Sequence, residues 1–211
     1  MGMIDNLMGA IIPNKLVAIC KKEKGSVGEG FKYLVLAGVI SILCTMISLT
    51  LAGTGGVFEV GYFLFAIVSL VLTLLLTYVA VWLAAWLISA LLKGKAEFGQ
   101  LFFALALPSS AIKIIIALVA LILGFIPVMG AMIAGLIGLV LGLYGLYLAY
   151  LVFKTIYGFE MVNAIISLVL YIVVNIIITM IVMGVVLALI VGLLGIGAIG
   201  GAGAMGWTPV M

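Results

Sequence analysis

The sequence contains no histidine and no arginine, and aspartate occurs once, at Asp5. Without histidine, the Ser–His and Cys–His pairs of hydrolases and the commonest zinc ligand are absent. A single aspartate also excludes a paired-aspartate membrane protease. The glutamates are scattered among predicted loops, and none repeats at metal-ligand spacing: Glu23, Glu29, Glu59, Glu97 and Glu160. We therefore expect a protein that is not an enzyme and has no metal site and no cofactor.

Charge of either sign is scarce. Charged residues make up 7% of the 211 residues, and nine lysines against six acids give a formal net charge of +3. Most lysines lie near the ends of apolar runs, so they form no phosphate-binding face, and we expect no nucleic-acid partner. The two cysteines, Cys20 and Cys44, fall before and within the first apolar run, which excludes a disulfide framework.

Apolar residues, in contrast, are abundant: 68% of the chain is hydrophobic, and the mean hydropathy is +1.61. A helix needs about 20 apolar residues to cross about 30 Å of hydrocarbon. Five runs reach that length: 33–52, 62–92, 101–123, 128–153 and 161–194. The sequence thus predicts an all-α fold in a lipid bilayer, a polytopic bundle of five transmembrane helices over residues 33–194.

Two of these runs are too long for a perpendicular crossing. Runs 62–92 and 161–194 would measure about 46 and 51 Å as straight helices, so they must tilt or extend beyond the bilayer. A sixth or re-entrant pass within 184–207 is an alternative, although that stretch offers no polar hairpin. We expect residues 195–211 to form a glycine-rich tail outside the bundle.

The lysines predict the orientation. Leaving Lys113 aside, all eight precede the first run or lie between the second and third or the fourth and fifth runs, and the other connections hold none. The positive-inside rule then places the amino terminus in the cytoplasm. Because the number of crossings is odd, the carboxyl terminus lies outside.

Residues 1–32 form an amphipathic cytoplasmic segment. Its apolar residues recur at helical spacing and are followed by Pro13, which helices tolerate at their start: Ile4, Leu7, Met8, Ile11 and Ile12. One interpretation is a helix lying on anionic lipid, with four charges facing the head groups: Lys15, Lys21, Lys22 and Lys24. The alternative is a helix that packs beneath the bundle.

Lys113 is the one ionisable residue within a predicted span. It follows Leu101 by about 18 Å of helix, close to the midplane, where a lysine costs at least about 2.5–3.5 kcal/mol. Other polar residues reach a similar depth: Asn175, Thr45, Thr73 and Thr77. We expect a midplane polar layer, either structural or lining a wet cavity. In the structural alternative, Lys113 bonds to backbone oxygens or reaches the outer head groups.

Small residues in the fourth run repeat every four positions: Gly130, Ala134, Gly138 and Gly142. Such a ridge lets another helix backbone approach closely, which drives helix association in lipid. The partner is either a helix of the same chain, which we favour, or a second subunit.

Short motifs in a fixed order carry a resemblance to a known family. They are Gly94-Lys-Ala-Glu-Phe98 before Leu105-Ala-Leu-Pro108, then Ile126-Pro127, Leu143-Tyr144-Gly-Leu-Tyr147, Tyr157-Gly158 and Asn163-Ala164. In order and spacing the chain resembles the Yip-domain family of five-pass membrane proteins, named for interaction with Ypt/Rab GTPases.

The resemblance implies a membrane-embedded bundle with a cytoplasmic amino terminus. It also implies, for eukaryotic members, a role in vesicle traffic, binding of prenylated small GTPases and homo- or hetero-oligomers. This chain lacks their longer cytoplasmic half and its acidic Tyr-Gly-Pro motif. We therefore expect a short member of prokaryotic type in the cell membrane, for which the resemblance does not imply GTPase binding. The leading hypothesis is a non-enzymatic membrane scaffold or organiser related to trafficking proteins, and the alternative is a small-solute or ion transporter or channel using Lys113.

Overall fold

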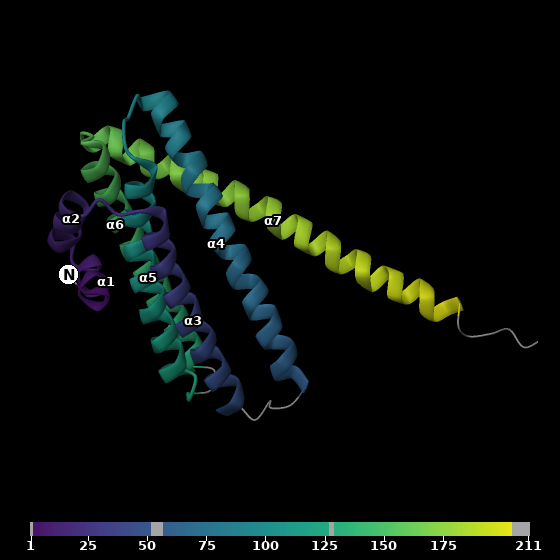
Figure 1. Cartoon of the computed structure of the whole chain (residues 1–211). Coiled ribbons are helices and arrows are strands. Elements are labelled where there is room, and N and C mark those ends of the chain that lie inside the picture. The colour runs from purple at the N-terminus through teal and green to yellow at the C-terminus, as the bar shows by residue number, and fades with distance from the viewer. Residues whose placement is uncertain (1, 52–56, 127–128, 204–211) are drawn as a thin grey trace, which may run out of the picture.

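The computed structural model describes residues 2–51, 57–126 and 129–203, and these form seven α-helices and no strand. Two short helices, α1 (Met3–Ala10) and α2 (Pro13–Lys22), precede five long ones, as Figure 1 shows. The long helices are α3 (Val27–Leu51), α4 (Val57–Leu92), α5 (Phe98–Leu123), α6 (Met129–Tyr157) and α7 (Met161–Gly203). The predicted all-α fold is confirmed. Residues 52–56 and 127–128, which overlap the predicted breaks 53–61 and 124–127, and residues 204–211 of the tail lie outside the described residues.

Five helices in the described part of the chain are long and apolar enough to cross a membrane. Their spanning segments are Val27–Ser48, Phe65–Leu92, Phe98–Leu123, Met129–Tyr157 and Met161–Val182. Large apolar side chains on their outer surfaces remain uncovered, for example Leu43, Leu136 and Val169. In water such surfaces would be unfavourable, but in lipid they are the expected outer layer of a helix bundle.

The longest helices are α4 and α7, with 36 and 43 residues, or about 54 and 64 Å of helix. Both exceed the hydrocarbon thickness of about 30 Å, and in Figure 1 α7 leaves the bundle obliquely. α7 is uninterrupted through Gly203, nine residues beyond the predicted end at 194, and it does not turn back between 184 and 203. A continuous helix satisfies every backbone group in lipid, which outweighs the low helix propensity of its glycines.

The bundle is built around α5, which packs most extensively on α3 and then on α6. Every residue from Leu101 to Pro108 is buried. α3 approaches this segment closely because Gly30 has no side chain: a Cβ there would lie 2.6 Å from Cδ1 of Phe102. The best-packed part of the core therefore lies in the first half of α5.

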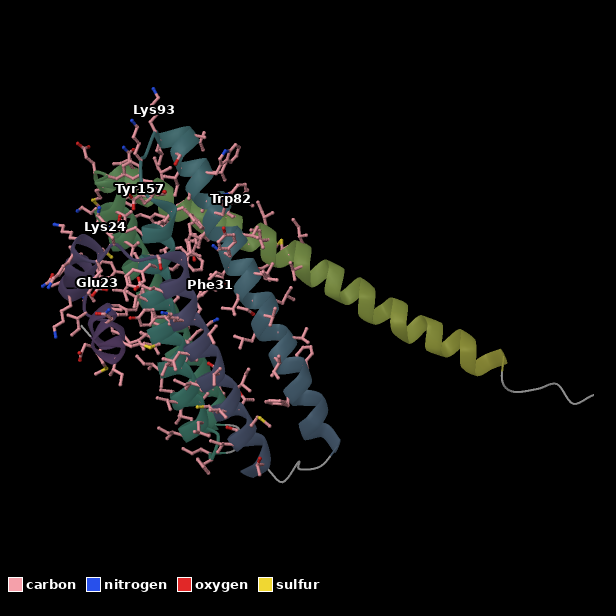
Figure 2. All side chains as sticks on the ribbon, viewed as in Figure 1. Glu23, Lys24, Phe31, Trp82, Lys93 and Tyr157 are labelled. Carbon is pink, nitrogen blue, oxygen red and sulfur yellow. The ribbon has the colours of Figure 1, made fainter. Side chains whose placement is uncertain are left out.

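This half of the bundle also carries the lysines, and we call it the lysine-bearing end. It includes α1, α2, residues 93–97 between α4 and α5, and residues 158–160 between α6 and α7. In Figure 2, Lys24 and Lys93 both point outward from this part of the molecule. The chain thus gathers on one end the lysines that the sequence distributes over three separate segments.

The hairpin of α1 and α2 docks on the bundle, α1 against α5 and α2 against α6. Leu16, Ile19 and Cys20 are buried in the same apolar core as the first half of α5. Polar contacts hold the hairpin as well: the Gln100 side-chain amide donates to the Cys20 carbonyl at 2.9 Å, and the Tyr144 hydroxyl donates to the Ile11 carbonyl. Of the two interpretations of the amino-terminal segment, α2 therefore follows the second, a helix that packs on the bundle.

The predicted apolar face of α1 is divided between the bundle and the surface. Ile4, Met8 and Ile12 are exposed, while Leu7 and Ile11 are half-buried. The buried side of α1 includes the polar Asn6, whose amide donates to the Glu23 carboxylate at 3.0 Å and to the Tyr33 hydroxyl at 3.3 Å. This hydrogen bond to Glu23 links the first residues of α1 to the end of α2 and fixes the hairpin's shape.

Candidate functional site

Lys113 lies near the middle of α5, 15 residues after Phe98 and 10 before Leu123. Its side chain is exposed to a groove of about 520 Å³ that lies between α3, α4 and α5. In Figure 1 α4 diverges from α3 along this part of the bundle. A volume of this size falls within the range of small-molecule sites, which is about 300–1,000 Å³.

The groove occupies the half of the bundle away from the lysine-bearing end. Its lining comes from residues 38–48 of α3, 65–73 of α4 and 113–121 of α5, and Lys113 is the α5 lining residue nearest the lysine-bearing end. From Leu101 to Ile112, every residue of α5 except Ser109 is buried. This packed segment closes the groove toward the lysine-bearing end.

Hydroxyl groups form the polar part of the wall. Ser41, Thr45 and Ser48 of α3 line the groove, as do Ser69 and Thr73 of α4. Thr45 donates to the Ser41 carbonyl at 2.9 Å, and Thr73 donates to the Ser69 carbonyl at 2.7 Å. Ser41 and Ser48 likewise donate to carbonyls four residues earlier. These four hydroxyl protons are thus used within their own helices, and their oxygens remain available as acceptors.

Of the described residues that line this groove, Lys113 is the only charged one. Among the described side chains, no acid lies within ion-pair distance of its ammonium group. Lys113 therefore supplies a positive charge and up to three N–H donors to a wall in which four of the five hydroxyl protons are already used.

The structure brings together three of the five residues predicted for the midplane layer, namely Lys113, Thr45 and Thr73. Thr77 lies one turn beyond Thr73 and donates to its carbonyl at 2.8 Å, outside the groove lining. Asn175 belongs to α7, which packs chiefly on α4 and α6, and it donates to the Tyr171 carbonyl of its own helix at 2.8 Å. Asn175 is thus not a neighbour of the groove.

Three hydroxyl residues of the groove are absent from the predicted layer: Ser41, Ser48 and Ser69. A signal for them exists in the sequence. In α3, hydroxyl residues recur four and then three positions apart, and in α4 Ser69 precedes Thr73 by four. Such spacing places them on one helix face. Periodicity of hydroxyl residues, rather than depth alone, would have identified these positions.

The predicted glycine ridge of α6 contacts the bundle only in part. A Cβ on Gly130 would lie 1.9 Å from the Leu123 carbonyl oxygen, so the first turn of α6 packs tightly on the last turn of α5. Ala134 is half-buried. A Cβ on Gly138 or Gly142 would meet no atom within 4 Å. The expectation of contact within the chain is therefore wrong at those two positions. On the same helix face, a Cβ on Gly145 would lie 3.0 Å from Cδ1 of Ile112, so α6 contacts α5 at Gly145 and not at Gly138 or Gly142.

The four lysines predicted to face lipid are all exposed on the docked hairpin: Lys15, Lys21, Lys22 and Lys24. A hollow of about 440 Å³ between α1 and α2 is lined by Met8 and Ile12 together with Lys15 and Lys22. Cys20, in contrast, is buried, and burial raises the pKa of its thiol to about 12, although a backbone hydrogen bond partly opposes this rise. At neutral pH this thiol is protonated and unreactive.

Five apolar helices of spanning length, with uncovered apolar surfaces and an internal groove, define an integral membrane protein that crosses the bilayer several times. No protein-family model, no curated protein and no solved structure matches the sequence. Among the described residues, no three cysteine or acidic side chains group closely enough to hold a metal ion.

Proposed function

We propose that the chain is a non-enzymatic membrane organiser of Yip-domain type, which holds anionic lipid at its lysine-bearing end. One observation carries this proposal: the docked hairpin exposes apolar and basic side chains together. Its apolar members are Ile4, Met8 and Ile12, and its basic members are Lys15, Lys21, Lys22 and Lys24. Apolar side chains that reach the acyl boundary, beside lysines at the head groups, are typical of helices that lie on membranes.

Docking strengthens this surface because the bundle holds the four lysines in place before any lipid binds. Each lysine near an anionic membrane surface contributes about 1 kcal/mol. A rigid cluster of four would enrich anionic lipid around the bundle and give a membrane partner protein a fixed surface to contact. The positive-inside rule supports a cytoplasmic position for this end.

The test is the lipid that accompanies the purified protein. Enrichment of anionic lipid is measured in nanodiscs of mixed zwitterionic and anionic lipid. In the quadruple variant K15Q/K21Q/K22Q/K24Q this enrichment is expected to be at least tenfold lower than in the natural chain. The matched control K15R/K21R/K22R/K24R keeps the charges and should keep the enrichment. If the glutamine variant enriches anionic lipid as the natural chain does, the proposal is wrong.

A small-solute or ion pathway is the second candidate, and the groove that reaches Lys113 favours it. Against a continuous pathway stands the packed segment of α5 between Leu101 and Ile112, which fills the bundle on the side of the lysine-bearing end. A pathway would require this segment to separate from α3. The groove therefore supports binding from one side better than passage.

A further inference from the structure

We propose that the groove between α3, α4 and α5 binds one long-chain carboxylate, with its head group on the Lys113 ammonium and its chain along the groove. This site is separate from the lysine-bearing surface of the hairpin. It lies in the opposite half of the bundle and depends on a different lysine. The proposal therefore goes beyond the membrane-organising role.

The charge of the groove selects an anion. Among the described residues that line it, Lys113 is the only charged one. An unpaired charge near the membrane midplane is unfavourable, so an anionic ligand supplies what the chain does not. Because Ser41, Thr45 and Thr73 donate their hydroxyl protons to their own helices, the charged donor for a carboxylate is Lys113, and the Ser69 hydroxyl is a second, neutral one.

The rest of the lining selects an apolar chain of limited size. Beyond Lys113 the walls are mostly aliphatic and aromatic, including Phe65, Leu70, Ile116 and Leu121. A volume of about 520 Å³ suits a single chain with a small head, whereas a two-chain phospholipid is much larger than the groove. From Lys113 the groove runs along residues 116–121 of α5, away from the lysine-bearing end.

The experiment measures binding of palmitate to the full chain in nanodiscs of zwitterionic lipid. We expect one palmitate per chain, and Lys113→Met should weaken binding at least tenfold, whereas Lys113→Arg should retain most of it. Methyl palmitate, which has the same chain without the charge, should bind the natural protein no better than palmitate binds Lys113→Met. Lys113→Met removes a costly charge from the membrane interior, so the variant is expected to fold.

A second variant tests the groove independently of charge. Ala120 lines the groove, and Ala120→Phe should fill it and abolish palmitate binding while Lys113 remains. The quadruple glutamine variant of the hairpin should bind palmitate normally, so failure of the organiser role and failure of this site are distinguishable. Equal binding of palmitate and its ester, or unchanged binding by Lys113→Met, would overturn the proposal. Displacement of palmitate by phosphatidylglycerol at equal concentration would overturn the choice of a single-chain ligand.

Discussion

Replacing Gly130 with alanine is expected to destabilise the bundle by about 1–3 kcal/mol, the range for overpacked cores. The reason is the tight connection between α5 and α6, in which the added Cβ would lie 1.9 Å from the Leu123 carbonyl oxygen and 2.9 Å from its carbon. Both are backbone atoms, so no side-chain rotation relieves the clash. The first turn of α6 would have to move away from α5.

Gly138→Ala is the matched control, since it makes the same change in the same helix where nothing lies within 4 Å. Alanine is favoured over glycine in a helix by roughly 0.5–1 kcal/mol, so this variant should be as stable as the natural chain or slightly more stable. Unfolding by sodium dodecyl sulfate, followed by circular dichroism, compares the two. Equal destabilisation by both variants would contradict the packing of α6 described above.

Replacing Leu16 with alanine is expected to release the amino-terminal hairpin from the bundle. Leu16 is fully buried, and truncating such a leucine costs about 2–5 kcal/mol. Release would expose Cys20 to water and return the pKa of its thiol from about 12 toward its ordinary value of 9.0. The thiolate fraction at pH 8 would then rise by roughly a thousandfold.

Maleimide labelling at pH 8, with mass spectrometry to separate the Cys20 peptide from that of Cys44, measures this release. The control is Ile12→Ala, because Ile12 is 44% exposed and contributes little to docking. Rapid labelling of Cys20 in Leu16→Ala, and slow labelling in Ile12→Ala and the natural chain, is the expected pattern. Slow labelling in Leu16→Ala would show that Leu16 does not hold the hairpin.

The helices themselves could be predicted from the sequence because lipid leaves a spanning segment little choice but to be helical. The start of α3 differs from the prediction, since the apolar run begins at Tyr33 whereas the helix begins at Val27. A capping box explains the difference: the Ser26 hydroxyl accepts from the Glu29 amide at 3.3 Å, and the Glu29 carboxylate accepts from the Ser26 amide at 3.1 Å. Its Ser-x-x-Glu pattern is visible in the sequence.

The lateral arrangement of the helices could not be predicted. Counting residues along a helix gives the depth of a side chain, and this placed Lys113 correctly beside Thr45 and Thr73. The same depth also suggested Asn175, but α7 packs on α4 and α6 instead. The spacing between α6 and α5 is not readable from the sequence either, since Gly130 packs on Leu123 whereas a Cβ on Gly138 would meet nothing within 4 Å. Depth follows from local geometry, whereas neighbours depend on all five helices together.

The proposed organiser role requires five crossings with the lysine-bearing end in the cytoplasm. This topology is tested directly in a variant in which Cys20 and Cys44 are both replaced by serine. Single cysteines are introduced into that variant, and a membrane-impermeant maleimide is added to intact cells. The sites are Lys93 and Glu160 at the lysine-bearing end and Phe125 between α5 and α6, all of which are exposed. We predict that Phe125→Cys is labelled in intact cells and that Lys93→Cys and Glu160→Cys are labelled only after permeabilisation. Labelling of Lys93→Cys and Phe125→Cys from the same side would contradict the account, because α5 would then not cross the membrane.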